Sequence, residues 1–372
     1  MPHDIKVKEM PRPFPKVFFR FDMYVLGIET SCDETAVATT RDDLILSSSV
    51  SSSVHLHRRF GGVVPEIASR YHVEYINYVL KDALCKARVD LNGIGLIAVT
   101  TRPGLAGALL VGESMAKALG LAKGIPVTSV DHVYAHLYSV FMKYKTDRKQ
   151  GRKATGSKVA RYPFIGFVVS GGHTSLFSVR GLGRYRLLGR TVDDAAGEAF
   201  DKVSKLLNLG YPGGPAIEKR AREGRIDAAL FPVGLSAANM DFSFSGIKTS
   251  VLYHIRDCLR KKGVLRHRAN KANEISRYVS RLGYDKTSDI AASFQHSMTE
   301  ILTEKAVLAC KREGIRRLVL GGGVSANRQL RDKLSERAVK NGISVFIPPI
   351  ELCLDNAAMV AGLGSALFRK VR

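Results

Sequence analysis

Two segments of this chain repeat one arrangement, in which an apolar strand, a polar turn and a return strand follow one another. Met23 to Ile28 is the first apolar strand, and Ala36 to Thr40 is its return strand. Phe164 to Val169 leads into Ser170-Gly171-Gly172-His173-Thr174, and Ser175 to Val179 forms the second return strand. Two hairpins of this kind, with turns suited to phosphate, predict a duplicated two-lobed nucleotide-binding fold.

Strands and helices alternate along the rest of the chain. Ile94 to Thr101 reads as a strand, and the periodicity of Ala108 to Ala122 favours a helix. Arg317 to Leu320 is a further strand that runs into a glycine turn and a helix. We therefore expect an α/β fold. A chain of 372 residues is also longer than one ordinary core supports, which again favours two lobes.

The expected domain boundaries follow from this pattern. Residues 23–141 form the N-terminal lobe, which residues from about 356 to 372 complete, and residues 163–355 form the C-terminal lobe. Residues 1–22 have neither the apolar region of a secretory signal nor the serines of a transit peptide. We expect them to form a short disordered extension.

The chain is strongly basic, with 57 Lys and Arg against 34 Asp and Glu and a formal net charge of +23. A field of this sign attracts polyanions, so nucleic acid is the first partner to consider. Residues 142–162 contain eight basic residues against one aspartate, and residues 254–286 contain ten more. We interpret both segments as basic insertions that either contact a phosphate backbone or simply face solvent.

The cysteine spacing and the length of the apolar runs bear on the compartment and on membrane association. The five cysteines form no CxxC pair, which is typical of reduced thiols in an intracellular protein. No apolar run approaches the roughly 20 residues that span a bilayer, so no membrane is expected as a partner.

His132 and His136 are four residues apart at the start of an expected helix, so both rings leave one helix face. This spacing suits a shared metal ion, although such pairs are also common on helix surfaces. Asp355, at a later helix start, is the best third ligand, and its alternative role is that of an N-cap. A zinc protease would need a glutamate after the first histidine, where this chain has Val133.

Glycine turns and nearby polar residues suggest a nucleotide site. The turn from Ser170 to Thr174 allows backbone N–H groups to approach a phosphate. Asp201 and Asn327 are placed to bond a ribose or base, Gly214 allows close approach to a sugar, and Glu218 lies one turn beyond. The alternatives are turns that need a positive φ for the glycines, and solvent-exposed or capping roles for the polar residues.

Several motifs together resemble the tRNA N6-adenosine threonylcarbamoyltransferase family, once labelled O-sialoglycoprotein endopeptidases. The similarity runs from about Met23 to the C-terminus and has the form of the bacterial and organellar branch. The motifs are GIETSCDET (27 to 35), GGVVPEIASR (61 to 70), PGLAGALLVG (103 to 112), HVYAH (132 to 136), VSGGHT (169 to 174), DDAAGEAFDK (193 to 202), YPGGP (211 to 215), DFSFSGIKT (241 to 249) and GGGVSANR (321 to 328).

The resemblance implies an actin-like, Hsp70-like ATPase fold with a duplicated core. It implies transfer of threonylcarbamoyl from threonylcarbamoyl-AMP to N6 of adenine 37 in tRNAs that read ANN codons, with release of AMP. One divalent metal per subunit, Fe²⁺ or Zn²⁺, would bind the predicted triad, and the adenylate would bind a second set. The metal set is His132, His136 and Asp355; the adenylate set is Val168, Val169, Ser170, Gly171, Gly172, Asp201, Gly214, Glu218 and Asn327.

The catalytic base is expected in the first hairpin. Asp33 and Glu34 would face the cleft and accept the proton of the attacking amine, although turn capping is their alternative role. His57 and Glu66 are weaker candidates.

The resemblance also implies partners and a compartment. Besides tRNA, members of the bacterial branch act with an inert paralogue of the same fold and a small P-loop ATPase, whereas mitochondrial members act as homodimers. The expected compartment is the cytoplasm of a bacterium, or otherwise an organellar matrix. Two other functions suit parts of the sequence: an ATP-hydrolysing or kinase-like enzyme of the same fold, and a non-catalytic tRNA-binding scaffold. Magnesium prefers oxygen ligands, which disfavours the first.

Overall fold

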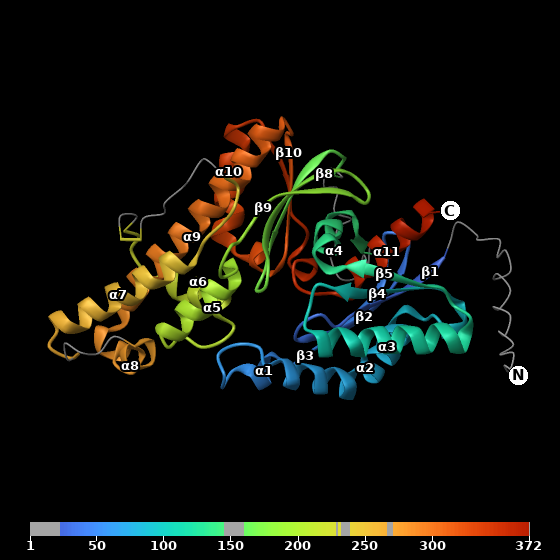
Figure 1. The fold of residues 1–372 in the computed structure, drawn as a ribbon, viewed down its shortest axis with the longest axis horizontal. Helices are drawn as coiled ribbons and strands as arrows, with labels where there is room; N and C mark the ends of the chain where they lie inside the picture. The colour runs from blue at the N-terminus through green and yellow to red at the C-terminus, as the bar shows by residue number, and fades with distance from the viewer. Residues whose placement is uncertain (1–22, 145–159, 228–229, 232–238, 266–270, 372) are drawn as a thin grey trace, which may run out of the picture.

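The computed structural model describes residues 23–144, 160–227, 230–231, 239–265 and 271–371, which form two β-sheets with helices packed on their faces (Figure 1). The predicted extension at 1–22 lies outside the described residues, as does most of the basic segment 142–162. We call the two halves built on these sheets the N-terminal and C-terminal lobes.

The first sheet has the strand order β5-β4-β1-β2-β3-β6. Strands β1, β2 and β3 form an antiparallel meander, and β4 and β5 extend it with parallel pairing on the other side of β1. The short strand β6 pairs in parallel with β3. The strands are β1 (Tyr24–Glu29), β2 (Glu34–Arg41), β3 (Leu44–Ser52), β4 (Ile94–Arg102), β5 (Val127–Asp131) and β6 (Lys143–Tyr144).

The second sheet repeats this topology, with the order β11-β10-β7-β8-β9. Strands β7, β8 and β9 form the meander, and β10 and β11 continue it in parallel. The strands are β7 (Phe164–Val169), β8 (Thr174–Gly181), β9 (Arg184–Arg190), β10 (Arg317–Gly321) and β11 (Ser344–Phe346). The duplicated core predicted from the two hairpins is therefore confirmed.

Helices cover both faces of the first sheet. Because side chains alternate along a strand, Leu26 and Ile28 of β1 pack towards α2 and α3, whereas Val25 packs towards α11. Figure 1 shows α2 and α3 below this sheet and the C-terminal helix α11 above it. The helices of this lobe are α1 (Val54–His57), α2 (Pro65–Ala87), α3 (Ala106–Lys123), α4 (His132–Tyr138) and α11 (Ala357–Val371), with the 3-10 turns η1 (Leu91–Gly93) and η2 (Ser139–Phe141).

The second lobe is mainly helical on one side of its sheet. The long helix α9 is buried along much of its length, and Phe294 packs edge-on against Phe200 of α5. The helices are α5 (Ala196–Leu206), α6 (Gly213–Ala221), α7 (Ser245–Lys261), α8 (Ala272–Ser276), α9 (Tyr284–Glu313) and α10 (Arg328–Lys340), with the 3-10 turns η4 (Val279–Leu282), η5 (Gly323–Ala326) and η6 (Ile350–Leu352).

Helix α4 lies between the two sheets and contacts both. Its Val133 and Leu137 pack with Phe164 of β7, while its Ala135 packs with residues of α11. Gly321 of β10 allows this approach, because a Cβ at that position would lie 2.7 Å from the carbonyl oxygen of His136. The helix that carries the histidine pair is thus fixed from both lobes.

The basic segment 254–286 is helical where it is described. It begins inside α7, whose Ile255 and Leu259 join the core of the C-terminal lobe, and it continues through α8 and η4. Its basic side chains Lys261, Arg277 and Arg281 are exposed. The segment therefore combines a buried apolar face with a basic outer face.

A hydrogen bond also joins the two lobes. The ammonium group of Lys205, in α5, donates a hydrogen bond of 3.1 Å to the carbonyl oxygen of Phe60, between α1 and α2.

The helices in the described ranges were compared with the length and hydropathy that a bilayer span needs, and none of them reaches both.

Candidate functional site

The start of α4 fixes the positions of both histidines. The Asp131 carboxylate caps the helix and accepts hydrogen bonds from the backbone N–H groups of Val133 (3.0 Å) and Tyr134 (3.2 Å). His132 is therefore the first helical residue, and His136 lies one turn later with its ring centroid 4.6 Å away. Both side chains are buried.

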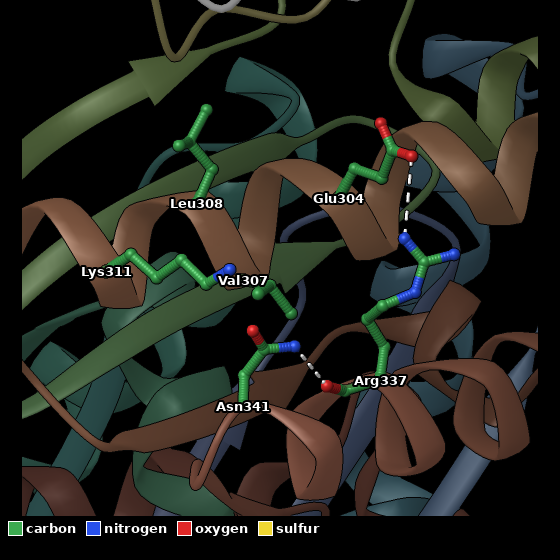
Figure 2. Close-up of a pocket in the computed structure, with 6 residues that line it drawn as sticks. All are labelled: Glu304, Val307, Leu308, Lys311, Arg337 and Asn341. Atoms are coloured by element: carbon green, nitrogen blue, oxygen red, sulfur yellow. Dashed lines mark hydrogen bonds and ion pairs between the residues drawn. The ribbon is translucent and has the colours of Figure 1, made fainter.

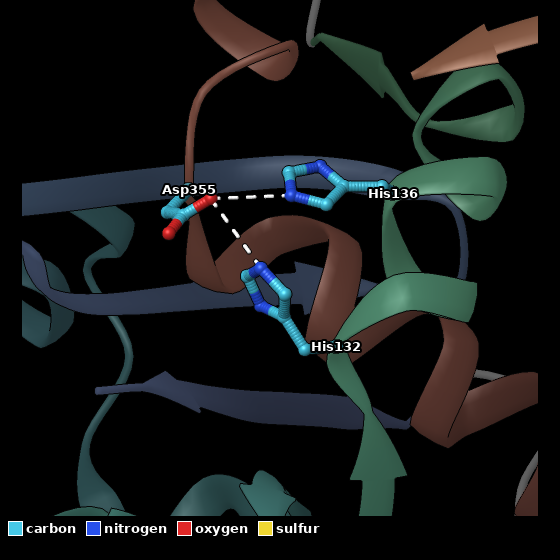
Figure 3. A group of neighbouring side chains, drawn as sticks. All are labelled: His132, His136 and Asp355. Atoms are coloured by element: carbon cyan, nitrogen blue, oxygen red, sulfur yellow. Dashed lines mark ion pairs between the residues drawn. The ribbon is translucent and has the colours of Figure 1, made fainter. Parts of the chain in front are cut away.

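Asp355 meets these rings from the other end of the chain (Figure 3). One carboxylate oxygen, Oδ1, lies 3.1 Å from Nε2 of His136 and 3.5 Å from Nε2 of His132. Helix α11 is capped by Asn356, whose side chain accepts from the N–H of Met359 at 3.0 Å. The N-cap role considered for Asp355 therefore belongs to its neighbour, and the Asp355 carboxylate is directed at the histidines.

The three side chains fit a divalent cation. One ligand atom from each lies within 4.8 Å of the other two. Protein ligands at about 2.0–2.2 Å from one metal ion are separated from each other by roughly 3–3.5 Å, which matches both Asp355 contacts. Both ring nitrogens of His136 are buried; within the described part of the chain Nδ1 has no hydrogen-bond partner, and Nε2 approaches Asp355 at 3.1 Å without hydrogen-bond geometry. A metal bond would satisfy the nitrogen that faces Asp355.

Glu29 contacts the ring nitrogen of His132 that faces away from Asp355, and the sequence motifs did not identify it. It is fully buried at the end of β1, and its Oε2 lies 2.9 Å from Nδ1 of His132. Thr100 donates to the same oxygen at 2.6 Å, and the N–H of Ser31 donates to Oε1 at 2.6 Å. The available signal was a charged residue at the end of an otherwise apolar strand.

These carboxylates determine the charge of the histidines. Burial alone would lower the pKa of His132, but Glu29 and Asp355 outweigh it and raise the pKa to about 9. Burial lowers the pKa of His136, and it lowers that of the neighbouring His173 to about 4. Against the effect of burial, the two metal-site histidines hold the pKa of Asp355 below its usual range.

Asp33 and Glu34 lie together near this centre, at the start of β2. Burial, followed by the charges of Asp33 and Asp355, raises the pKa of Glu34 well above its usual value. Glu34 also hydrogen-bonds Asp33 and accepts from Ser52 Oγ at 3.2 Å. A carboxyl group that keeps its proton is a donor, so the two predicted bases are not equivalent.

The glycine turn after β7 lies beside the candidate metal site, since the rings of His173 and His132 are 6.4 Å apart between centroids. The turn is closed by a hydrogen bond of 2.7 Å from the N–H of Ser170 to the carbonyl oxygen of His173. A Cβ added at Gly171 or Gly172 would meet no atom within 4 Å, and neither residue has a positive φ. The missing side chains therefore leave open space.

Gly214 has the same property at the start of α6, where an added Cβ would again meet nothing within 4 Å. Its neighbour Gly213 differs, because a Cβ there would lie 2.5 Å from Cα of Asp201. The positive-φ alternative thus fails for Gly171, Gly172 and Gly214, and we call these three residues the glycine cradle.

The polar residues predicted around the adenylate already have internal partners. Asp201 accepts from the N–H of Gly213 at 2.6 Å, and Glu218 accepts from the N–H of Arg328 at 3.1 Å. Asn327 caps α10 through the N–H of Leu330 (3.0 Å) and donates to Gln295 (2.9 Å).

The remaining candidates are placed differently. Val168 and Val169 are fully buried, so only their backbone could reach a ligand. His57 is also fully buried, and it accepts from the N–H of Val64 (3.3 Å) and contacts Ser53 Oγ (3.0 Å), which orders the loop before α2. Glu66 is exposed in the first turn of α2.

A separate pocket lies between α9 and α10 (Figure 2). It contains none of the predicted site residues, and Arg337 at its edge pairs with Glu304 at 3.5 Å. Its lining residues are Glu304, Val307, Leu308, Lys311, Arg337 and Asn341.

Comparison with known proteins gives consistent matches. A family model described as tRNA N6-adenosine threonylcarbamoyltransferase matches residues 44–362. Relatives with that name from Thermosipho melanesiensis and Anaeromyxobacter dehalogenans are 46% and 47% identical over 347 and 352 residues. These alignments cover 93% and 94% of this chain and 95% of each relative.

Solved structures show the fold. HypF from T. kodakarensis is similar with a TM-score of 0.56 and 13% identity, over 95% of this chain and 48% of that one. Full-length HypF in its phosphate- and nucleotide-bound form gives 0.54 and 14%, over 94% and 47%. The chain thus spans about half the length of these proteins. It has the duplicated actin-like ATPase fold expected from its sequence.

Proposed function

Because the chain belongs to the tRNA N6-adenosine threonylcarbamoyltransferase family, we propose that its histidine–aspartate centre and its glycine cradle together form the active site of that reaction. The protein is a transferase that makes threonylcarbamoyladenosine in tRNA. The observation that supports the placement of the site is that Asp355 meets His132 and His136 between the lobes, beside a cradle that side chains do not fill. Neither a kinase-like role nor a non-catalytic scaffold is favoured.

The donor in this proposal is threonylcarbamoyl-AMP, with its adenylate in the glycine cradle. Gly171 and Gly172 expose backbone N–H groups at the turn after β7, which suits a phosphate. Gly214 leaves room for the ribose or base next to Asp201. Transfer to the tRNA amine then releases AMP.

His132, His136 and Asp355 would hold one divalent cation, Fe²⁺ or Zn²⁺. Two imidazoles and one carboxylate leave further coordination positions open, so such an ion would bind anionic oxygens of the donor and polarise them. The burial of both histidines and the partial burial of Asp355 support this assignment, because they limit the access of water to the ion.

Positioning and proton transfer are the tasks left to the protein. The exocyclic amine of adenine is a weak nucleophile because its lone pair is delocalised into the ring, so holding it in line with the carbamoyl carbon contributes strongly. Asp33 is the better candidate for accepting the amine proton, since burial and neighbouring carboxylates raise the pKa of Glu34 and favour its protonated form. Glu34 would then act as a hydrogen-bond donor to Asp33.

The partners and compartment are proposed from the family. The acceptor is a tRNA that reads ANN codons, and the basic charge of the chain suits it. The protein would act with an inert paralogue and a small P-loop ATPase, or as a homodimer. Its compartment is the one that holds the tRNA, a bacterial cytoplasm or an organellar matrix.

The test is transfer of labelled threonine into an ANN-decoding tRNA from chemically made threonylcarbamoyl-AMP. We expect product with the wild-type chain and at least a hundredfold less with His132→Ala, because one metal ligand is lost. His296→Ala is the matched control, since His296 lies on α9 near Lys333 and away from the centre. It should retain full transfer.

Absence of product from the wild type, even after the paralogue and the ATPase are added, would contradict the proposal. Equal activity in His132→Ala would keep the reaction but remove the metal centre from it.

A further inference from the structure

Glu29 determines which nitrogen of His132 is available to a metal ion. A carboxylate can only accept hydrogen bonds, so Nδ1 of His132, 2.9 Å from Glu29 Oε2, must carry a proton. In the neutral ring the lone pair then lies on Nε2, the atom that faces Asp355 at 3.5 Å. The donors Thr100 and Ser31 hold the Glu29 carboxylate in this position.

Charge balance points to the same residue. Glu29 and Asp355 both pair with histidines; Glu29 is fully buried and Asp355 is partly buried. Two such negative charges with two neutral imidazoles are balanced by one ion of charge +2, whereas one carboxylate alone would leave an excess positive charge in a largely buried site.

We propose that Glu29 is the positioning residue of the metal centre, which it serves by fixing the tautomer and orientation of His132 and by supplying the second negative charge that a divalent ion requires. This inference rests on the proposed metal-binding function. It concerns His132 specifically, because Nδ1 of His136 has no hydrogen-bond partner among the described residues.

Glu29→Gln tests the proposal with little change in shape. The amide must turn its NH₂ group towards either Ser31 N–H or His132, and both are donors in the native arrangement. If the NH₂ faces His132, the ring accepts through Nδ1 and places its proton on Nε2, where the metal ion would bind. Outer-layer substitutions of this kind typically weaken metal binding about 10–100-fold.

The measurement is the Zn²⁺ affinity of the full-length chain, obtained by competition with a chromophoric chelator. We expect Glu29→Gln to bind zinc about 10–100-fold more weakly than wild type. The increase in melting temperature on adding zinc should shrink accordingly, whereas a merely structural role would lower the melting temperature equally with zinc and with chelator. Asp43→Asn is the control, because Asp43 bonds Tyr138 of the same helix α4 at 2.9 Å without touching the centre.

Each outcome decides the proposal. Zinc affinity of Glu29→Gln within threefold of wild type, or an equal loss in Asp43→Asn, would overturn the role of Glu29 alone. A wild-type chain that binds zinc no better than His132→Ala would overturn the metal centre and the role of Glu29 together. If Glu29→Gln does not fold, Glu29→Asp replaces it: the shorter side chain keeps the charge but withdraws from Nδ1, so native affinity there would also overturn the proposal.

Discussion

Asp201 lies within α5, half-buried, where it accepts a hydrogen bond of 2.6 Å from the N–H of Gly213. Burial, followed at longer range by the negative charge of Asp33, raises the pKa of Asp201 to about 6. In the unfolded chain this pKa returns to near 3.9. The folded protein therefore binds a proton between about pH 4 and pH 6 that the unfolded chain does not bind.

The free energy of unfolding should therefore depend on whether Asp201 is protonated. Because the pKa of Asp201 is higher in the folded protein than in the unfolded chain, its proton stabilises the fold at pH 4. This stabilisation is lost as the pH rises through about 6. Asp201→Asn keeps an acceptor for Gly213 but carries no charge. We therefore expect the free energy of unfolding of the variant, relative to wild type, to rise by up to about 3 kcal/mol between pH 4 and pH 7.5, as measured by urea denaturation.

Asp285→Asn provides the comparison, since it removes the same charge from an exposed position in the first turn of α9. The change in the free energy of unfolding between pH 4 and pH 7.5, relative to wild type, should be larger for Asp201→Asn than for this variant. Equal changes for the two variants would show that burial does not perturb Asp201.

Single residues also show what local sequence can predict. The spacing of His132 and His136 is a property of one helix, so their proximity could be anticipated without tertiary information. Asp355 could be chosen only as an acidic residue at a late helix start, because nothing in its neighbourhood indicates a contact more than 200 residues away. Glu29 was missed because its role depends on Thr100 and His132, which only the assembled sheet brings to it.

At the scale of elements, the strands with apolar sequences were predictable and two strands with polar sequences were not. Strand β7 was expected at 164–169 and lies there, since all six of its residues are buried. Strand β9 was not predicted, because its sequence RYRLLGR is mostly exposed and has little hydrophobic signal. Strand β3 is rich in serine and escaped notice for the same reason. The duplication of three-stranded meanders therefore became visible only in the structure.

Two neighbouring glycines at the start of α6 should respond differently to substitution, because Gly214 faces open space and Gly213 packs against backbone. Gly214→Val should fill the open cradle and weaken binding of a non-hydrolysable threonylcarbamoyl-AMP analogue at least tenfold by calorimetry, with a melting temperature within about 2 °C of wild type. Gly213→Ala should instead lower the melting temperature by several degrees, because its Cβ would overlap the backbone at Asp201.

Normal binding of the analogue by Gly214→Val would contradict this prediction. If Gly214→Val binds the analogue normally, then the space in front of this glycine is not the adenylate site, and the proposed cradle would be reduced to Gly171 and Gly172.

At the scale of the whole molecule, the net charge of +23 acts together with the exposed basic face of α7, α8 and η4. We expect neutralisation of four exposed side chains there to weaken tRNA binding and to flatten its salt dependence. The slope of log K against log salt should fall by up to about 0.7–0.9 for each phosphate that the variant no longer neutralises. The substitutions are Lys261→Gln, Lys271→Gln, Arg277→Gln and Arg281→Gln.

A second set of four substitutions changes the net charge equally on the other lobe. These residues lie on α2 and α3, and the variants are Lys81→Gln, Lys86→Gln, Lys117→Gln and Lys123→Gln. The same change of slope in both sets would indicate a general charge effect and would contradict a docking face on the helices of the C-terminal lobe.

The origin of the metal ligands in distant parts of the chain has a consequence for the order of events in the cell. A ribosome synthesises His132 and His136 before the whole second sheet, and it reaches Asp355 only after β11. A nascent chain therefore carries two of the three proposed ligands for most of its synthesis without a complete site. With this ligand set, a metal ion would be retained tightly only after both lobes have been made and α11 has returned to the first sheet, so its uptake would mark the completion of folding.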